Sequence, residues 1–182
     1  LSTLAPVRQA GWSEHQVPGS LIDAVYAGTS AAVPGATELA ASLPVNTFAV
    51  LQSGSQSVLV RRRRDGFEQV GPDVEAWGLR PRNKEQRFAL AHLLDPTVPV
   101  VALDGRAGTG KTLCAVAAGL EQVVEQRQYA RLCVYRPVIP VGKADLGYLP
   151  GALDEKLDPW MAAIIDAMSA LTERRSPEDA RQ

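Results

Sequence analysis

The stretch that decides the fold is LDGRAGTGKTLCAV, residues 103–116 of a chain of 182 residues. Within it, Gly105 to Thr112 match the pattern G-x-x-x-x-G-K-[ST] at every fixed position. A continuous apolar run, Val98 to Leu103 broken only by a proline, precedes the pattern, and apolar residues then recur every three to four positions as far as Val124. A buried strand, a glycine-rich loop and an amphipathic helix in this order predict a phosphate-binding loop.

The residue types of this loop are suited to binding a nucleoside triphosphate and its metal ion. Glycines at 105, 108 and 110 let the backbone curl so that successive N–H groups point at phosphate oxygens, and the helix N-terminus adds partial positive charge. Lys111 is expected to neutralise the β and γ phosphates, and Thr112 to place its hydroxyl on Mg²⁺. The other positions of the expected nucleotide-binding segment are Gly105, Arg106, Ala107, Gly108, Thr109, Gly110 and Leu113. The alternative is a glycine-rich turn with an exposed lysine.

Composition bounds the class of protein. With 46% hydrophobic and 21% charged residues, the chain can form one ordinary core, or one core and a small appendage. The net charge of −1 gives no overall basic surface, so nucleic acid would have to bind a local patch. No apolar run is long enough for a membrane helix, and we expect a cytoplasmic protein. Cys114 and Cys133 both lie in apolar runs and are expected to be buried free thiols.

The first half of the chain changes character near residue 46. Residues 1–45 are rich in Ala, Gly, Pro and Ser, and we expect a linker or the remnant of a preceding domain, with one short helix at 21–26. Residues 46–76 hold short β-favouring runs joined by glycine-containing turns, which predicts a three-stranded meander. Such a meander is too small to be stable alone. We therefore expect it to pack on the following domain or on a missing one.

Residues 77–171 are predicted to form the N-terminal part of a P-loop domain. A helix capped by Asn83 ends at Asp95-Pro96, and the strand 98–103, the loop, its helix and a strand at 132–135 then make a βαβ unit. A last helix is predicted to begin with Asp158 as N-cap and Pro159 at the first helical position. Its expected apolar stripe is Trp160, Ile164, Ala167 or Met168, and Leu171. The charged segment 172–182 is expected to be disordered.

Gln86 is the candidate reader of the nucleobase. It lies on the predicted helix before the loop, and a glutamine amide can both donate to and accept from the edge of adenine. This would favour ATP over GTP. A solvent-exposed helix glutamine without such a role fits the residues equally well.

Four segments carry a family resemblance. PRNKEQ (81–86), LDGRAGTGKTLCAVAAGLEQV (103–123), YRPVIPVGKADLGYLPG (135–151) and EKLDPWMAAIIDAM (155–168) together resemble the PhoH-like ATPases. The similarity is strongest to members in which a PIN nuclease domain precedes the ATPase, and it covers about residues 77–168. The meander resembles the small β region that joins the two domains there.

The resemblance implies an α/β fold with a RecA-like parallel sheet, related to superfamily 1 helicases. It implies ATP and Mg²⁺ as ligands, a hexamer-like ring in the full-length parent, and RNA unwinding, with single-stranded RNA as a partner, coupled to cleavage by a PIN nuclease domain or protein. Gln86 takes the adenine-reading role and Lys111 the catalytic phosphate role. Arg136 falls where such helicases carry a nucleic-acid-contacting motif, although a strand-end arginine on solvent is the alternative.

Two departures from the family pattern limit the expected activity. Such an ATPase needs a strand ending in Asp-Glu to hold Mg²⁺ and activate water, whereas the only look-alike is Ala162–Asp166, with Ala167 in place of the glutamate. Helical periodicity favours an ordinary helix there. The N-terminal stretch also lacks the clustered carboxylates of a PIN nuclease. We therefore expect the first half of such an ATPase, with weak or no hydrolysis.

Three further interpretations stay open at this point. The chain is alternatively a non-catalytic nucleotide- or RNA-binding regulatory module, or a small-molecule kinase, for which no lid arginines or acceptor carboxylate are evident. The run Arg61 to Arg64 could contact an RNA backbone. A solvated strand end before a turn is the favoured interpretation of that run.

Overall fold

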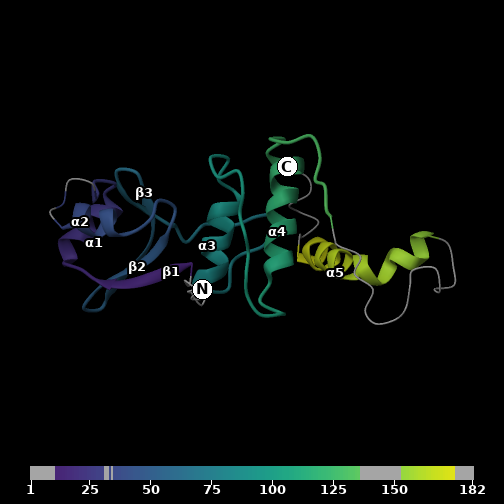
Figure 1. Ribbon diagram of the computed structural model, residues 1–182, viewed down its shortest axis with the longest axis horizontal. Helices are drawn as coiled ribbons and strands as arrows, with labels where there is room; N and C mark the ends of the chain where they lie inside the picture. The colour runs from purple at the N-terminus through teal and green to yellow at the C-terminus, as the bar shows by residue number, and fades with distance from the viewer. Residues whose placement is uncertain (1–10, 31–32, 34, 136–152, 175–182) are drawn as a thin grey trace, which may run out of the picture. The chain divides into compact units, whose positions relative to one another are not determined.

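The computed structural model describes residues 11–30, 33, 35–135 and 153–174, with only the backbone described at 153–160 and 174. The chain divides into two compact units, Leu1–Asp73 and Val74–Gln182, which we call the N-terminal and C-terminal units. In Figure 1 the N-terminal unit is coloured purple to blue and the C-terminal unit teal to yellow. Each has its own apolar core. In the described ranges, no helix combines the length and the apolar character that crossing a membrane requires.

The N-terminal unit is built on a four-stranded sheet in the order β1-β2-β3-β4. The strands are β1 (Trp12–Gln16), β2 (Phe48–Ser53), β3 (Gln56–Arg63) and β4 (Gly66–Gln69). β2, β3 and β4 pair antiparallel, with Leu51 opposite Val58 and Val60 opposite Gln69, so the predicted meander is confirmed. Gly54 lies in the tight turn between β2 and β3 at φ 59°, a conformation that glycine adopts without strain.

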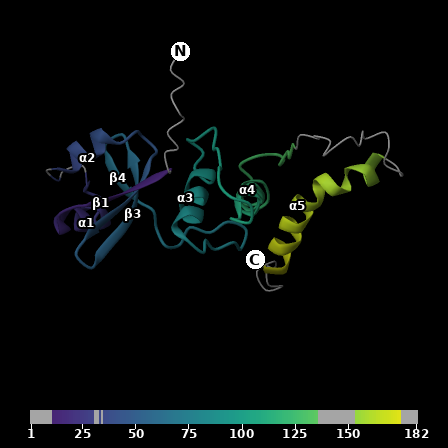
Figure 2. The same ribbon diagram turned by 60° about the horizontal axis from the view of Figure 1, so that its bottom comes forward.

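The expectation of a linker over residues 1–45 is wrong for its described part. β1 pairs parallel with β2, and α1 (Gly19–Tyr26) and α2 (Ala36–Ser42) pack beside the sheet (Figure 2). Together they bury a core of Leu21, Ile22, Val25, Ala36, Ala40, Ala49, Leu51, Val58, Val60 and Phe67. The meander therefore packs on the segment that precedes it. The strand escaped prediction because, as an edge strand, WSEHQ needs few apolar residues.

The arginine run has structural partners inside the N-terminal unit. Arg61 is only 3% exposed, and its Nη2 and Nε donate to Asn46 Oδ1 at 2.7 and 3.2 Å. Arg62 Nε donates to the carbonyl of Ala40, and Arg63 Nε lies 2.8 Å from Glu68 Oε2. The favoured interpretation, a solvated strand end, is wrong for Arg61, which is buried, while Arg62 and Arg63 are partly buried and Arg64 is exposed.

The C-terminal unit is a layer of helices, with α4 (Lys111–Leu120) in contact with both α3 (Lys84–Leu93) and α5 (Leu153–Arg174). A π-helical turn, η2 (Glu121–Glu125), continues α4. Ile164, Ala167 and Leu171 of α5 are buried, as the predicted stripe requires, and Met168 is exposed. The core also holds Ala76, Leu79, Leu90, Cys114, Val116, Ala117 and Ala118.

The two strands predicted around the loop are wrong. Residues 98–103 and 132–135 form neither helix nor strand, and Val100 and Tyr135 are 81% and 88% exposed. An extended run becomes a strand only when a neighbour pairs with its N–H and C=O groups, and the described part of this unit supplies no such neighbour. The predicted βαβ unit and parallel sheet are thus not formed here. Cys133, expected to be buried, is exposed.

The last helix is longer than predicted. α5 begins at Leu153, so Asp158 and Pro159 lie inside it rather than at its start. Pro159 is the seventh residue of α5, past the first turn, where a proline removes one backbone hydrogen bond and favours a kink. α5 also runs to Arg174, so residues 172–174 are helical instead of disordered, while 175–182 lie outside the described residues.

Candidate phosphate-binding site

The predicted loop closes on the N-terminus of α4. Gly105, Gly108 and Gly110 have φ values of 153°, 77° and 89°, which residues with a side chain rarely adopt. Gly110 caps α4, whose first intrahelical bond of this turn runs from Cys114 N–H to Gly110 O at 2.9 Å. The N–H groups that precede Cys114 in the helix have no intrahelical acceptor. The backbone therefore collects amide donors where the sequence predicts phosphate.

The Lys111 ammonium lies across the loop. Its Nζ donates to the carbonyls of Gly105 and Arg106 at 2.8 and 2.7 Å. The Thr109 hydroxyl donates to the same Arg106 carbonyl at 2.9 Å. Thr112, the second residue of α4, is exposed. Lys111 and Thr109 thus share the Arg106 carbonyl as an acceptor next to the N-terminus of α4.

Gln86 contacts the loop itself. Asn83 caps α3 by accepting from Gln86 N–H at 2.8 Å, which confirms the predicted N-cap. The Gln86 side chain accepts from Arg82 N–H at 2.9 Å and donates through Nε2 to Thr109 O at 3.1 Å. A methyl group at Gly110 would lie 2.9 Å from Gln86 Nε2, so the last glycine of the loop makes room for this amide. The contact to the loop was not anticipated from sequence.

Two residues that the sequence reasoning missed hold the far end of α4. Gln122 in η2 is buried, and its Nε2 donates to Leu93 O at 2.9 Å and to Ala118 O at 3.0 Å. Glu121 Oε2 accepts from Trp77 N–H at 2.9 Å. The helix that carries the loop is therefore bonded to α3 at both ends. The signal in the sequence that could have revealed Gln122 is the presence of a glutamine inside an apolar helical pattern.

Trp77 has a positive φ of 49°. It lies in a tight turn whose ends, Ala76 and Leu79, pair as an isolated β-bridge. Gly78 follows at φ 72°. A tryptophan in this backbone region costs about 1 kcal/mol or more, and the Glu121 carboxylate bonded to its N–H offsets part of that cost. Trp77 also packs against the core of the C-terminal unit.

Cys114 lies in α4, three residues after Lys111, and belongs to the core of the C-terminal unit. Burial raises the pKa of the Cys114 thiol, so the sulfur is a neutral packing group at physiological pH. Cys114 and Cys133 are both free thiols.

In the part of the chain that the structure describes, the loop residues 105–113 include no Asp or Glu. Nowhere in that part do three or more His, Cys, Asp or Glu residues gather as a metal site would require. The segment Ala162–Asp166 lies within α5 with Asp166 exposed, so its interpretation as an ordinary helix is confirmed. Arg136 lies outside the described residues.

Comparison with known proteins settles the family. The model of the PhoH-like protein family matches residues 78–181, which is more than half of the chain. The chain is a PhoH-like protein. The match spans α3, the loop, α4 and α5, so the helices and the site described above belong to the PhoH-like region.

Three PhoH2 proteins illustrate the relationship. Protein PhoH2 of Thermobispora bispora is 45% identical over 147 residues, which cover 79% of this chain and 33% of the relative. Protein PhoH2 of Mycolicibacterium smegmatis is 42% identical over 164 residues, covering 88% of this chain and 36% of the relative. Protein PhoH2 of Bacillus subtilis is 50% identical over 108 residues, covering 59% and 24%.

The PhoH-like chain thus spans about a third or less of the length of these relatives. The matches confirm the resemblance to the PhoH-like family, while the link to a PIN nuclease stays a prediction. No solved structure matches the chain significantly.

Proposed function

We propose that this chain binds ATP with Mg²⁺ at residues 105–113, as the nucleotide-binding part of a PhoH-like ATPase. One observation carries the proposal: the loop glycines hold positive φ values directly before the N-terminus of α4, with Lys111 reaching across them. Backbone amides, a helix N-terminus and an ammonium group together form the environment that a triphosphate requires.

The loop can exchange its internal bonds for phosphate. Lys111 Nζ is held by two neutral carbonyls, of Gly105 and Arg106. A hydrogen bond from an ammonium to a charged phosphate oxygen is roughly twice as strong as one to a neutral acceptor. Phosphate therefore competes for the ammonium. The released carbonyls remain exposed to water, which satisfies them.

Thr112 is the residue that would hold Mg²⁺, because its hydroxyl is exposed on the first turn of α4. When bound, the ion neutralises charge on the β and γ phosphates. Orienting the attacking water needs an acidic group as well. Within the described ranges, Asp104 is the carboxylate that directly precedes the loop in the sequence. We therefore expect hydrolysis below about 0.1 per second, which is slow beside typical enzymes.

The activity of the whole protein is proposed from the family alone. We infer that a full-length parent unwinds RNA with ATP, as a ring related to superfamily 1 helicases and working with a PIN nuclease. Single-stranded RNA would then be contacted through Arg136. In the same parent, the runs 98–103 and 132–135 would join a RecA-like parallel sheet, which accounts for apolar side chains at exposed positions such as Val100 and Tyr135.

Isothermal titration with Mg·ATP and Mg·GTP tests the proposal on the full chain. Binding of ATP with a Kd in the micromolar to low millimolar range is expected, and Lys111→Ala should weaken it at least tenfold because a charge-assisted contact is lost. Lys84→Ala is the matched control, since Lys84 starts α3 outside the loop. Equal affinities of the wild type and Lys111→Ala would contradict the proposal.

A non-catalytic nucleotide-binding module is the second candidate function. Backbone amides and the N-terminus of α4 suffice to bind phosphate, and residues 105–113 themselves include no Asp or Glu. ATP binding without measurable phosphate release over hours would support this module, whereas turnover above about 0.1 per second would exclude it.

A further inference from the structure

We propose that Gln86 is a positioning residue for the phosphate loop, which it holds from α3 whatever base the nucleotide carries. The inference rests on the proposed nucleotide binding at the loop and goes beyond the adenine-reading role predicted from sequence. Its basis is a pair of hydrogen bonds, from Arg82 N–H to Gln86 Oε1 at 2.9 Å and from Gln86 Nε2 to Thr109 O at 3.1 Å.

The orientation of the Gln86 amide is chemically determined. A backbone N–H can only donate, so the side-chain atom facing Arg82 N–H must be the oxygen. A carbonyl can only accept, so the atom facing Thr109 O must be the nitrogen. The two contacts therefore agree on one orientation, and reversing the amide would break both.

The contact falls between two glycines of the loop. Thr109 stands between Gly108 and Gly110, both at positive φ, where the chain has the freedom of glycine on each side. The C=O and N–H of a trans peptide point in opposite directions. By binding Thr109 O, Gln86 therefore turns the N–H of Gly110 away from itself and fixes that peptide plane at the entry to α4.

The anchor of Gln86 is itself rigid. The residue sits in the first turn of α3, where its own N–H is bonded to the Asn83 cap at 2.8 Å. α3 is bonded again to the far end of α4 through Gln122 and Leu93 O. The loop is thus held against a helix pair that is fixed at both ends.

Loop positioning leaves base recognition possible. A glutamine amide has two N–H donors and two acceptor lone pairs, and the contacts to Arg82 and Thr109 use one of each. The remaining donor and acceptor can meet the edge of adenine. The Gln86 side chain would then contact both the base and the phosphate loop. A bound base would thereby hold the peptide between Thr109 and Gly110 in place.

A ligand without a base separates the two roles. We would titrate the full chain with Mg²⁺ and inorganic tripolyphosphate, ATP or GTP, using Gln86→Met and Gln86→Glu. Methionine keeps the length but neither hydrogen bond, and glutamate keeps the acceptor for Arg82 N–H while setting a carboxylate oxygen against Thr109 O. Gln128→Met is the matched control, an exposed glutamine outside the loop and α3.

We expect Gln86→Met to weaken tripolyphosphate and GTP by about 3- to 10-fold, and ATP by more because the base contact is also lost. Gln86→Glu should be weaker still for every ligand, and Gln128→Met unchanged. In the ligand-free protein, the amide NMR resonances of Thr109 and Gly110 should shift in both Gln86 variants and not in the control. The melting temperature, measured in parallel, shows that each variant is folded.

The outcomes separate this inference from the proposed function. If Gln86→Met binds tripolyphosphate as the wild type does, the positioning role is overturned, and nucleotide binding stands. Unchanged Thr109 and Gly110 resonances would overturn it equally. If the folded wild type binds none of the three ligands, the proposed function and this inference fall together.

Discussion

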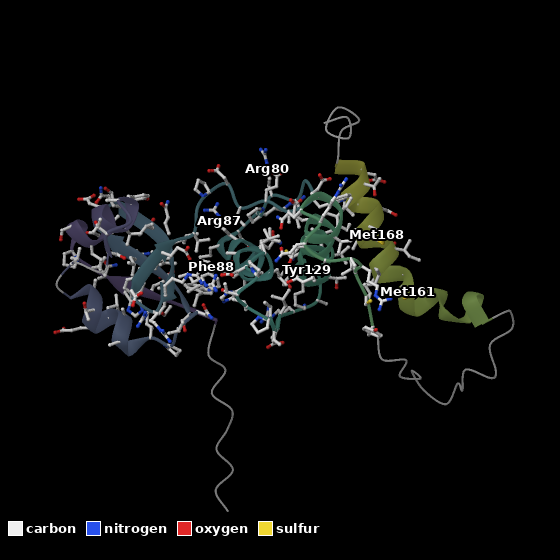
Figure 3. All side chains as sticks on the ribbon, turned by 90° about the horizontal axis from the view of Figure 1, so that it is seen from above. Arg80, Arg87, Phe88, Tyr129, Met161 and Met168 are labelled. Atoms are coloured by element: carbon white, nitrogen blue, oxygen red, sulfur yellow. The ribbon has the colours of Figure 1, made fainter. Side chains whose placement is uncertain are left out.

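The N-terminal and C-terminal units differ in how completely they cover their apolar surface. In the N-terminal unit the described large apolar side chains that remain exposed are Tyr26 and Val45. In the C-terminal unit they include Val100, Val124, Tyr129, Leu132, Val134, Tyr135, Met161, Ile165 and Met168. Figure 3 shows Met161 and Met168 along α5. The first unit pairs its strands and covers them with its own helices, whereas the second packs helices beside unpaired apolar runs.

The difference shows what a phosphate loop needs in order to form. The loop, its glycine conformations and its lysine contacts are present in the unit without a described sheet. The loop and α4 are bonded to α3 and to Trp77 by hydrogen bonds that join residues 23, 29 and 44 positions apart in the sequence. The geometry of the site therefore rests on helix packing, while the neighbouring strands require partners.

The largest test compares two fully buried leucines, Leu51 in β2 and Leu171 in α5. Leu51→Ala should lower the free energy of unfolding of the N-terminal unit by about 4 kcal/mol, because a closed core relaxes little around a cavity. Leu171→Ala should cost the C-terminal unit about 2 kcal/mol, because a helix with an exposed apolar face can shift to refill it. Urea denaturation followed residue by residue by NMR gives both values. A larger loss for Leu171→Ala would contradict the comparison.

The Asn46–Arg61 hydrogen bonds test how much a buried polar contact stabilises the N-terminal unit. Asn46→Ala should destabilise the N-terminal unit by about 2–3 kcal/mol, since it removes one acceptor of a buried guanidinium and places alanine at φ 71°. Asn46→Gly removes only the acceptor and should cost about 1 kcal/mol less. Equal losses for the two variants, measured by the same denaturation, would show that the backbone conformation contributes nothing.

Gln122 tests the link between α3 and α4 in the C-terminal unit. Gln122→Met keeps the volume and loses the bonds to Leu93 O and Ala118 O, which should lower the stability of the C-terminal unit by about 1 kcal/mol. Amide exchange in α3 and α4 should quicken, with the N-terminal unit unaffected. Gln128→Met, at an exposed position, serves as the control. An equal loss of stability in that variant would show that the hydrogen bonds of Gln122 do not link the two helices.

The reactivity of the two thiols is the test with the smallest expected effect on the protein. Because burial raises the pKa of the Cys114 thiol, the thiolate fraction at pH 8 is lowered, and the sulfur is also shielded from reagents. Cys133 is exposed. One thiol should therefore react rapidly with a disulfide reagent, and the second only when urea opens the C-terminal unit. Rapid reaction of Cys114 in Cys133→Ser would contradict its burial.

The features that could be predicted from the sequence are those that depend on local signals. The glycines before Lys111 mark backbone angles that other residues rarely adopt, and the structure has those angles at Gly105, Gly108 and Gly110. Asn83 directly before a helical pattern marks a cap, because its side chain needs only a backbone N–H three residues later. Short β-favouring runs joined by turns likewise mark β2 to β4.

Features that depend on distant partners were not predictable in the same way. β1 carries few apolar residues and is defined by its pairing with β2. The run 98–103 has the composition of a strand, yet composition supplies no neighbour for its hydrogen bonds. The Gln86 contact with Thr109 likewise depends on how α3 packs against α4, which no spacing in the sequence reveals.

The most direct measurement of the central claim is the unfolding of each unit with and without Mg·ATP. Binding at the loop should raise the melting temperature of the C-terminal unit, leave that of the N-terminal unit unchanged, and have no effect in Lys111→Ala. A rise that persists in Lys111→Ala, or that occurs in the N-terminal unit, would contradict nucleotide binding at residues 105–113.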